Sequence, residues 1–203
     1  NVHHFADMIE EWVSAQDILP MEVSDERGQL LETGGGVLNA KPYLEGCGQF
    51  LIHNVDIISD LDIRWMASQT RRDAMATLLV SDRVTSRYLL FDPDTMRLKG
   101  WTNVVTGEVR SPYPELDVTQ CRRLAFSGIH IMSDTVFAAL EDFVSRQGLD
   151  PEHPRFPIMD FYLSACALYE IYGVEADGLH LVDVGKLDTL EIAEKEISRV
   201  SQN

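Results

Sequence analysis

The sequence is short of basic residues and of cysteine. Its 17 Lys and Arg stand against 33 Asp and Glu, which gives the 203-residue chain a formal net charge of -16. Such a charge disfavours non-specific binding of nucleic acid or of an anionic membrane, so a phosphate ligand would need a metal ion or local help. The three cysteines show no CxxC spacing, which argues against a disulfide framework and a zinc knuckle and favours the reducing cytoplasm.

Long apolar runs and paired histidines are missing as well. No stretch approaches the roughly 18 apolar residues that a membrane span needs. None of the six histidines forms an HxH or HxxxH pair, which makes a histidine metal site improbable. What is present, 45% hydrophobic and 25% charged residues, is typical of a globular chain that buries a core.

The order of apolar and amphipathic segments predicts an α/β fold with a Rossmann-like, doubly wound mixed sheet, in a single domain over residues 1–203. Apolar residues at 3 and 4 spacing predict a helix over Phe5–Val13, and the nearly continuous apolar run Gln49–Val55 predicts a strand buried on both faces. Further helices are expected at about Leu61–Gln69, Val136–Val144, Ile158–Tyr172 and Leu187–Val200, and further strands at Met21–Ser24, Ala74–Val80, Tyr88–Phe91, Thr102–Val109, Leu124–Met132 and Leu179–Val182.

Two aspartates follow predicted strands. Asp56 comes directly after Gln49–Val55, and Asp183 comes directly after Leu179–Val182 and shortly before Gly185. Ligands bind outside the carboxyl ends of strands in open α/β sheets, and two carboxylates can jointly hold Mg²⁺. The alternative is that each Asp is a turn residue or a helix N-cap.

Three consecutive glycines in Glu32–Gly36 form the next candidate. Glycines before a helical segment expose backbone N–H groups to an anion or to the edge of a nucleobase. A flexible turn or a close strand-to-helix junction explains them equally well, and they match neither the Walker spacing nor GxGxxG.

Several short segments, taken in their order along the chain, resemble the sugar-1-phosphate nucleotidyltransferases. The resemblance spans essentially the whole chain and is closest to the branch of N-acetylmuramate-1-phosphate uridylyltransferases and mannose-1-phosphate guanylyltransferase-like proteins. The segments are Asn1–His4, Val23–Glu26, Leu30–Gly36, Phe50–Asp56, Phe126–His130 and Asp183–Gly185.

The resemblance implies a nucleotide-diphospho-sugar transferase fold and the transfer of a nucleotidyl group from a nucleoside triphosphate to a sugar 1-phosphate, with pyrophosphate released. It implies Mg²⁺ as cofactor and no nucleic-acid or membrane partner, and it allows a homo-oligomer. The residues that it assigns are Asp56 and Asp183 to the metal, Thr33, Gly34, Gly35 and Asn54 to the nucleotide, and Gly100, Ser127 and Gly128 to the sugar.

The sequence also departs from the family pattern. The family's N-terminal Gly-rich loop with Arg and Lys, which would carry the catalytic residues, has no match, so we expect it to precede Asn1. Lys186 stands where the family usually has Thr. An alternative is therefore a catalytically silent nucleotide-sugar-binding or regulatory protein on the same fold. A Mg²⁺-dependent phosphohydrolase using Asp56 ranks last, because its second carboxylate would stand where the chain has Ile58.

Overall fold

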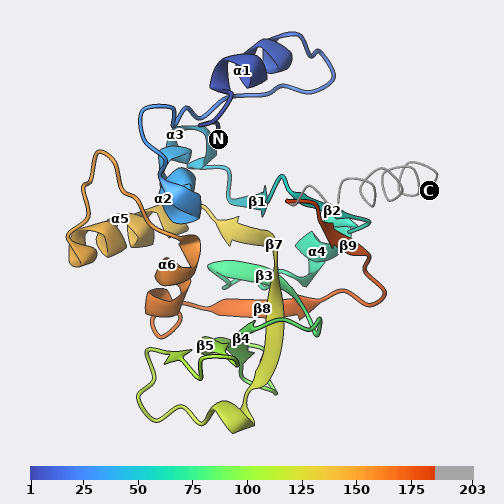
Figure 1. Cartoon of the computed structure of the whole chain (residues 1–203), viewed down its shortest axis with the longest axis vertical. Coiled ribbons are helices and arrows are strands. Elements are labelled where there is room, and N and C mark those ends of the chain that lie inside the picture. Colours follow the sequence, from blue (N-terminus) through green and yellow to red (C-terminus); the bar gives the residue numbers. More distant parts are fainter. Residues whose placement is uncertain (186–203) are drawn as a thin grey trace. The chain divides into compact units, whose positions relative to one another are not determined.

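The structure is a computed structural model that describes residues 1–185 (Figure 1). It divides into two compact units. The first unit comprises Asn1–Gly48 and Asp134–Ala165, and the second comprises Gln49–Ser133 and the chain from Cys166 onward. The helix predicted over Leu187–Val200 lies outside the described residues. Within the described part, no helix combines the length and the apolar character that crossing a membrane requires.

The second unit is built on a mixed sheet. Its strands run in the order β6-β5-β4-β7-β3-β8, and β1 also pairs with β7. All described pairs of this sheet are antiparallel except β3 with β8. The predicted mixed α/β sheet is therefore confirmed, with antiparallel pairing dominant. The strands are β1 (Gln49–His53), β3 (Ala76–Ser81), β4 (Arg87–Phe91), β5 (Leu98–Asn103), β6 (Val109–Arg110), β7 (Arg122–Ser133) and β8 (Ile171–Glu175).

The strand β7 organises this sheet. It is 12 residues long and hydrogen-bonds to β3 along one edge, while β1 and β4 share the other edge. Beside the sheet, α4 (Ile63–Gln69) begins where the side chain of Asp62 accepts hydrogen bonds from two backbone N–H groups, as a helix N-cap does. Met66 of α4 then packs against buried Leu79 and Ile129 of the sheet, which forms the core of this unit.

A separate two-stranded ribbon completes the second unit. It pairs β2 (Ile57–Ser59) with β9 (Leu181–Asp183) in antiparallel register. Its two strands come from distant parts of the chain and lie side by side in Figure 1. The ribbon connects two loops that leave the main sheet, so it positions the residues at its ends.

The first unit is helical. Its helix α1 is amphipathic, as predicted, with Asp7 in its first turn. The helices are α1 (Ala6–Ser14), α2 (Glu32–Asn39), α3 (Lys41–Leu44), α5 (Val136–Gln147) and α6 (Ile158–Ala165). The predicted strand Met21–Ser24 is wrong, because this segment is irregular and only Asp25, just after it, bridges to Val2.

Two further predictions are wrong for physical reasons. The segment Ile158–Tyr172 is not one helix, because Ile171 and Tyr172 belong to β8 and pair with Ala76 and Thr77 of β3. The run Gln49–Val55 is not buried on both faces either. Among the described strands β1 pairs with β7 alone, and only Phe50 of β1 is buried.

A buried histidine lies in the centre of β7. His130 is opposite Leu78 of β3 and Ile52 of β1, and only 2% of its surface is exposed. Its ring also lies edge-on to Phe126. Because burial penalises the charged imidazolium, the pKa of His130 falls from 6.5 to about 3.

This shift predicts a loss of stability in acid. As the pH falls below 6.5 the unfolded chain protonates this histidine, whereas the folded chain does so only near pH 3, so protonation favours unfolding across that window. Relative to a His130→Phe variant, the parent should lose about 2 kcal/mol of unfolding free energy between pH 7.5 and pH 5. Urea titrations at both pH values measure the difference. The matched control is exposed His153→Phe, and an equal pH dependence in the two variants would contradict the assignment.

Candidate functional site

The β2–β9 ribbon brings Asp56 and Asp183 together. Asp183 is the last residue of β9 and lies opposite Ile57, the residue after Asp56. The pairing extends one residue further, since the backbone N–H of Val184 donates to the carbonyl oxygen of Asp56 at 2.7 Å. The two aspartates expected at the ends of different strands are therefore neighbours, and we call them the carboxylate pair.

Gly185 shows how close the two carboxylates are. A Cβ atom built on Gly185 would lie 3.0 Å from Oδ2 of Asp56 and 3.2 Å from Oδ1 of Asp183. The backbone N–H of Gly185 donates to that same Oδ1 of Asp183 at 3.0 Å, which fixes the orientation of the carboxylate. Oxygens from both side chains thus border one small space beside Gly185. Asp56 is half-buried and Asp183 is exposed, so the space is accessible from solvent.

This arrangement suits a hard cation. Mg²⁺ is usually held by one or two protein carboxylates and completes its coordination with water and with oxygens of a bound phosphate. Within residues 1–185, no group of three or more His, Cys, Asp or Glu side chains could hold a metal ion. The described residues therefore contain no set of side chains that could surround a metal ion by themselves. The carboxylate pair fits a cation that is shared with a phosphorylated ligand.

Asn54 and Gly128 lie together near the carboxylate pair. The backbone N–H of Asn54 donates to the carbonyl oxygen of Gly128 at 3.0 Å, and its carbonyl oxygen accepts from the N–H of Ile57 at 3.2 Å. This turn leads from β1 into β2 and carries Asp56. Gly128 has a φ of 75°, and a Cβ atom there would lie 2.9 Å from Nδ2 of Asn54, so glycine is required for both backbone and space.

Ser127 is at an irregular point of β7. The register against β3 shifts here, because Leu78 and Val80 of β3 lie opposite His130 and Phe126 of β7. Such β-bulges are frequent next to active sites, where they redirect side chains. Ser127 is 3% exposed, and its Oγ is one of three buried side-chain atoms in the described chain without a hydrogen-bond partner. Ser127 and Gly128, which the family resemblance assigns to the sugar, therefore lie at a β-bulge of β7.

Gly100 does not join this group. It pairs with Leu90, which in turn pairs with Arg123 of β7. Along the strand direction alone, that row is roughly 16 Å from Gly128. A Cβ atom on Gly100 would lie 2.7 Å from the carbonyl oxygen of Arg110 and 3.0 Å from Cβ of Ser111, so the glycine allows the chain to pack closely at this point.

Thr33, Gly34 and Gly35 belong to the first unit, inside α2 rather than before a helix. The N–H groups of Gly34 and Gly35 donate to the carbonyl oxygen of Phe156 at 2.9 and 3.2 Å. Oγ1 of Thr33 accepts from the N–H of Ile158 at 2.9 Å. In the described chain no strand precedes α2, so these glycines do not form the strand-to-helix junction that we gave as an alternative; they let α2 pack closely against Pro154 and Phe156. The assignment of these residues to a nucleotide stays a prediction.

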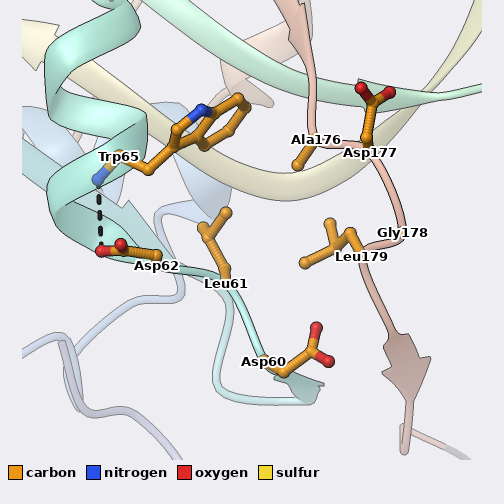
Figure 2. Close-up of a pocket in the computed structure, with 8 residues that line it drawn as sticks. All are labelled: Asp60, Leu61, Asp62, Trp65, Ala176, Asp177, Gly178 and Leu179. Atoms are coloured by element: carbon orange, nitrogen blue, oxygen red, sulfur yellow. Dashed lines mark hydrogen bonds between the residues drawn. The ribbon is translucent and has the colours of Figure 1, made fainter.

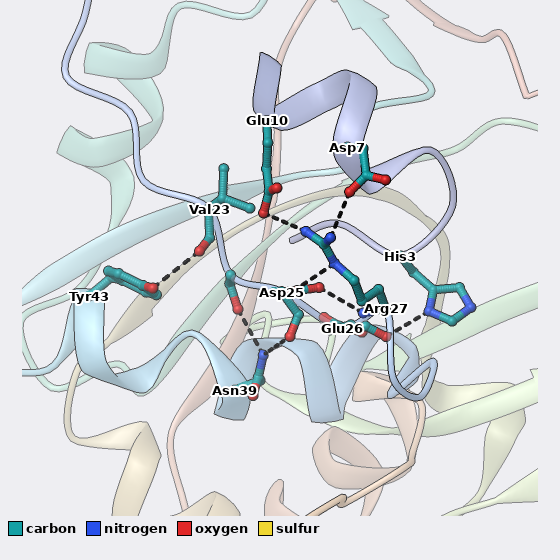
Figure 3. A network of polar contacts seen from close by, with 10 residues as sticks. His3, Asp7, Glu10, Val23, Asp25, Glu26, Arg27, Asn39 and Tyr43 are labelled. Atoms are coloured by element: carbon teal, nitrogen blue, oxygen red, sulfur yellow. Dashed lines mark hydrogen bonds and ion pairs between the residues drawn. The ribbon is translucent and has the colours of Figure 1, made fainter. Parts of the chain in front are cut away.

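A polar network that the sequence did not suggest surrounds Arg27 in the first unit (Figure 3). Its guanidinium group forms ion pairs with Asp7 and Glu10 of α1 and with Asp25, at 2.6 to 2.8 Å. The backbone N–H of Arg27 also donates to Asp25 and lowers the pKa of that carboxyl group. The network ties α1 to the loop before α2, so we assign it a structural role.

Glu26 acts beside this network. Its side chain is 7% exposed and accepts hydrogen bonds from Nδ2 of Asn1 and from the N–H of Leu31. Its carbonyl oxygen accepts a hydrogen bond from Nδ1 of His3 at 2.7 Å (Figure 3). The segments Asn1–His4 and Val23–Glu26, which contribute to the family resemblance, are therefore held together by a buried carboxylate.

A pocket of about 400 Å³ lies at the other end of the ribbon, where Asp60 follows β2 (Figure 2). It is lined by Asp60, Leu61, Asp62, Trp65, Ala176, Asp177, Gly178 and Leu179. Oδ1 of Asp60 accepts from the N–H of His180 and Oδ1 of Asp62 from the N–H of Trp65, so both carboxylates stabilise local backbone. The carboxylate pair, rather than this pocket, is therefore the candidate site.

Comparisons with known proteins point to one family. Over 62 residues the chain is 42% identical to the N-acetylmuramate alpha-1-phosphate uridylyltransferase of Caulobacter vibrioides. That match is 29% of this chain and 25% of the relative, so the chain spans about a quarter of the length of this curated relative. The resemblance to sugar-1-phosphate nucleotidyltransferases is confirmed. No protein-family model matches the chain.

Solved structures confirm the fold. The crystal structure of HddC from Yersinia pseudotuberculosis matches with a TM-score of 0.66 and 17% identity, over 96% of this chain and 76% of HddC. The inositol-1-phosphate CTP transferase from T. maritima matches with a TM-score of 0.66 and 12% identity, over 98% of this chain and 74% of that enzyme. The chain has the nucleotide-diphospho-sugar transferase fold.

The packing of α2 predicts which of its glycines resist substitution. A Cβ atom on Gly35 would overlap the carbonyl group of Pro154, which is backbone and cannot rotate away. Gly35→Ala should lower the free energy of unfolding by about 1–3 kcal/mol, as overpacking of a tight contact does. Urea denaturation provides the measurement. Gly28→Ala is the control, since no atom lies within 4 Å of a Cβ at Gly28, and equal stability of the two variants would contradict this packing.

Proposed function

We propose that this chain forms part of a Mg²⁺-dependent sugar-1-phosphate nucleotidyltransferase, with the metal ion held by Asp56 and Asp183. Sugar-phosphate nucleotidyl transfer in general is supported by the relative and by the fold. The observation that carries the proposal for this chain is the meeting of the two carboxylates beside Gly185. The comparison with known proteins and the local geometry of the two aspartates therefore support the same kind of reaction.

The proposed reaction is an in-line displacement. An oxygen of the sugar 1-phosphate forms a bond to the α-phosphorus of the nucleoside triphosphate, and the bond from that phosphorus to the pyrophosphate oxygen breaks, so its electron pair leaves with pyrophosphate. A bound Mg²⁺ ion would supply neutralisation of the phosphate charge. The residues of this chain would position the two substrates, which is the main task of an enzyme in such transfers.

Asp56 and Asp183 would fix where the charged phosphates lie. The N–H of Gly185 orients the carboxylate of Asp183, and the N–H of Val184 holds the main-chain carbonyl of Asp56 in place. This rigidity supports catalysis, because a site that is already ordered loses little entropy when substrate binds. Asp56 holds its place because the turn from Asn54 to Ile57 closes with a hydrogen bond.

We further propose that Asn54 contacts the nucleotide and that Ser127 and Gly128 contact the sugar. The support is their proximity, since Asn54 packs on Gly128, and the buried hydroxyl of Ser127, which lacks a partner. A role for Gly100 in sugar binding has less support, because protein atoms fill the space beside it. A nucleotide role for Thr33, Gly34 and Gly35 would use groups other than the two N–H groups and the hydroxyl that already bind the 156–158 segment.

The substrates would be a nucleoside triphosphate and a sugar 1-phosphate in the cytoplasm. The cysteines Cys47, Cys121 and Cys166 are thiols rather than disulfides, which agrees with a reducing compartment. A homo-oligomer remains an expectation from the family resemblance.

A second candidate is a nucleotide-sugar-binding protein without catalysis. It would use the same fold and the same carboxylate pair to bind a phosphorylated ligand. The two candidates differ in one measurable property, the release of pyrophosphate.

The decisive test is pyrophosphate release from UTP, GTP, CTP or dTTP with a panel of sugar 1-phosphates and Mg²⁺. It should be run on the 203-residue chain and on the product of its whole gene. In the active form, Asp56→Asn and Asp183→Asn should each lower the rate at least about 100-fold, and chelation of Mg²⁺ should abolish it.

Asp177→Asn is the matched control, because Asp177 lines the pocket at the opposite end of the ribbon and should keep the parent rate. Full activity in both carboxylate-pair variants would refute the metal assignment. Binding of a nucleotide sugar without any pyrophosphate release, in every form tested, would favour the second candidate.

A further inference from the structure

Gly185 has an unusual environment for a glycine outside helices and strands. The atoms nearest to a Cβ built there are Oδ2 of Asp56 at 3.0 Å, Oδ1 of Asp183 at 3.2 Å and Cβ of Asp56 at 3.7 Å. Two of these three atoms are carboxylate oxygens, one from Asp56 in the turn before β2 and one from Asp183 at the end of β9. The missing side chain of Gly185 therefore leaves open a space that both carboxylates face.

Backbone conformation does not account for this glycine. Gly185 is not among the glycines with positive φ, so its φ does not by itself require glycine. Gly178, in the loop before β9, is the opposite case. It has a φ of 69°, and no atom lies within 4 Å of its Cβ position. Glycine is thus needed at 178 for the turn, and at 185 for the space beside the carboxylates.

We propose that Gly185 is a positioning residue of the cation site, keeping open the space between Asp56 and Asp183 that the ion occupies. This inference rests on the proposed function, because it requires a cation at the carboxylate pair. Mg²⁺ binds oxygen ligands at about 2.0–2.1 Å, so a cation held by both carboxylates would need open space beside their oxygens. A methyl group at Gly185 would lie 3.0 and 3.2 Å from the two oxygens, closer than ordinary van der Waals contact, and it would compete for that space.

The backbone of Gly185 adds a second effect. Its N–H donates to Oδ1 of Asp183, so the residue that leaves the space open also orients one of the two ligands. A side chain at 185 pushes against Oδ1 of Asp183 and Oδ2 of Asp56 at once. Displacement of either oxygen changes the distance between the ligands, and metal affinity is sensitive to such changes around its ligands.

The test uses Mn²⁺ as the probe, with the free ion counted by electron paramagnetic resonance, so it does not require an active enzyme. Gly185→Ala should weaken Mn²⁺ binding at least about tenfold relative to the parent chain. Val184→Ala is the local control. It alters the neighbouring side chain but adds no atom beside the carboxylates, and the Val184 N–H that bonds to Asp56 is retained. Gly28→Ala controls for the change from glycine to alanine at an open position. Both controls should bind Mn²⁺ as the parent does.

Thermal unfolding without metal separates folding from binding, and affinities are compared well below every midpoint. Parent-like Mn²⁺ affinity in Gly185→Ala overturns the proposal, and so does an equal loss in Val184→Ala, which would indicate a general weakening of the ribbon. Asp56→Asn and Asp183→Asn distinguish a failure of the metal site from a failure of the role proposed for Gly185. If both lose Mn²⁺ while Gly185→Ala keeps it, only the role of Gly185 fails, whereas a parent chain that binds no Mn²⁺ overturns the metal site and this inference together.

Discussion

The pairing of β2 with β9 is the interaction on which the candidate site depends. Ribbons of three residues a strand are marginal by themselves, so this one relies on what surrounds it. Ile57 and Leu181 pack against the cluster of Met66, Leu79, Ile129 and Ile131, and that contact holds both strands on the core of the second unit. Apolar burial of Ile57, one residue from Asp56, and of Leu181, two residues from Asp183, therefore places the carboxylate pair, and the charged groups need not stabilise the fold themselves.

Glycine residues have different structural roles at different positions of this chain. At Gly128 it provides a positive φ within a long strand, and at Gly35 it allows a helix to approach a backbone carbonyl. At Gly185 it leaves a space bordered by oxygens of two aspartates. All three positions look alike in the sequence. They differ in the chemistry of the nearest atoms, since carbon and carbonyl groups indicate packing, whereas two carboxylates indicate room for a cation.

Much of the second unit could be predicted from local patterns, because the apolar run at Ala74–Val80 and the helical pattern at about Leu61–Gln69 each extend over a few residues. The carboxylate pair could be named because each Asp follows a strand. Its construction could not be foreseen, since strand partners are chosen by long-range packing. The helix predicted over Ile158–Tyr172 failed for the same reason: apolar periodicity does not reveal that Ile171 and Tyr172 extend a sheet beside β3.

The negative charge of the chain and that of its candidate site have the same consequence, since both repel a phosphate ligand. A chain with a formal net charge of -16 repels phosphate at long range, and two adjacent aspartates repel it further at short range. In the proposed function, a divalent cation held by Asp56 and Asp183 would reverse the local sign, so that a phosphate could bind where the two carboxylates otherwise repel it. The surrounding negative charge then acts in favour of the cation by raising its local concentration. Selectivity for phosphate would in this way depend on the metal, and a chain without it should bind neither substrate tightly.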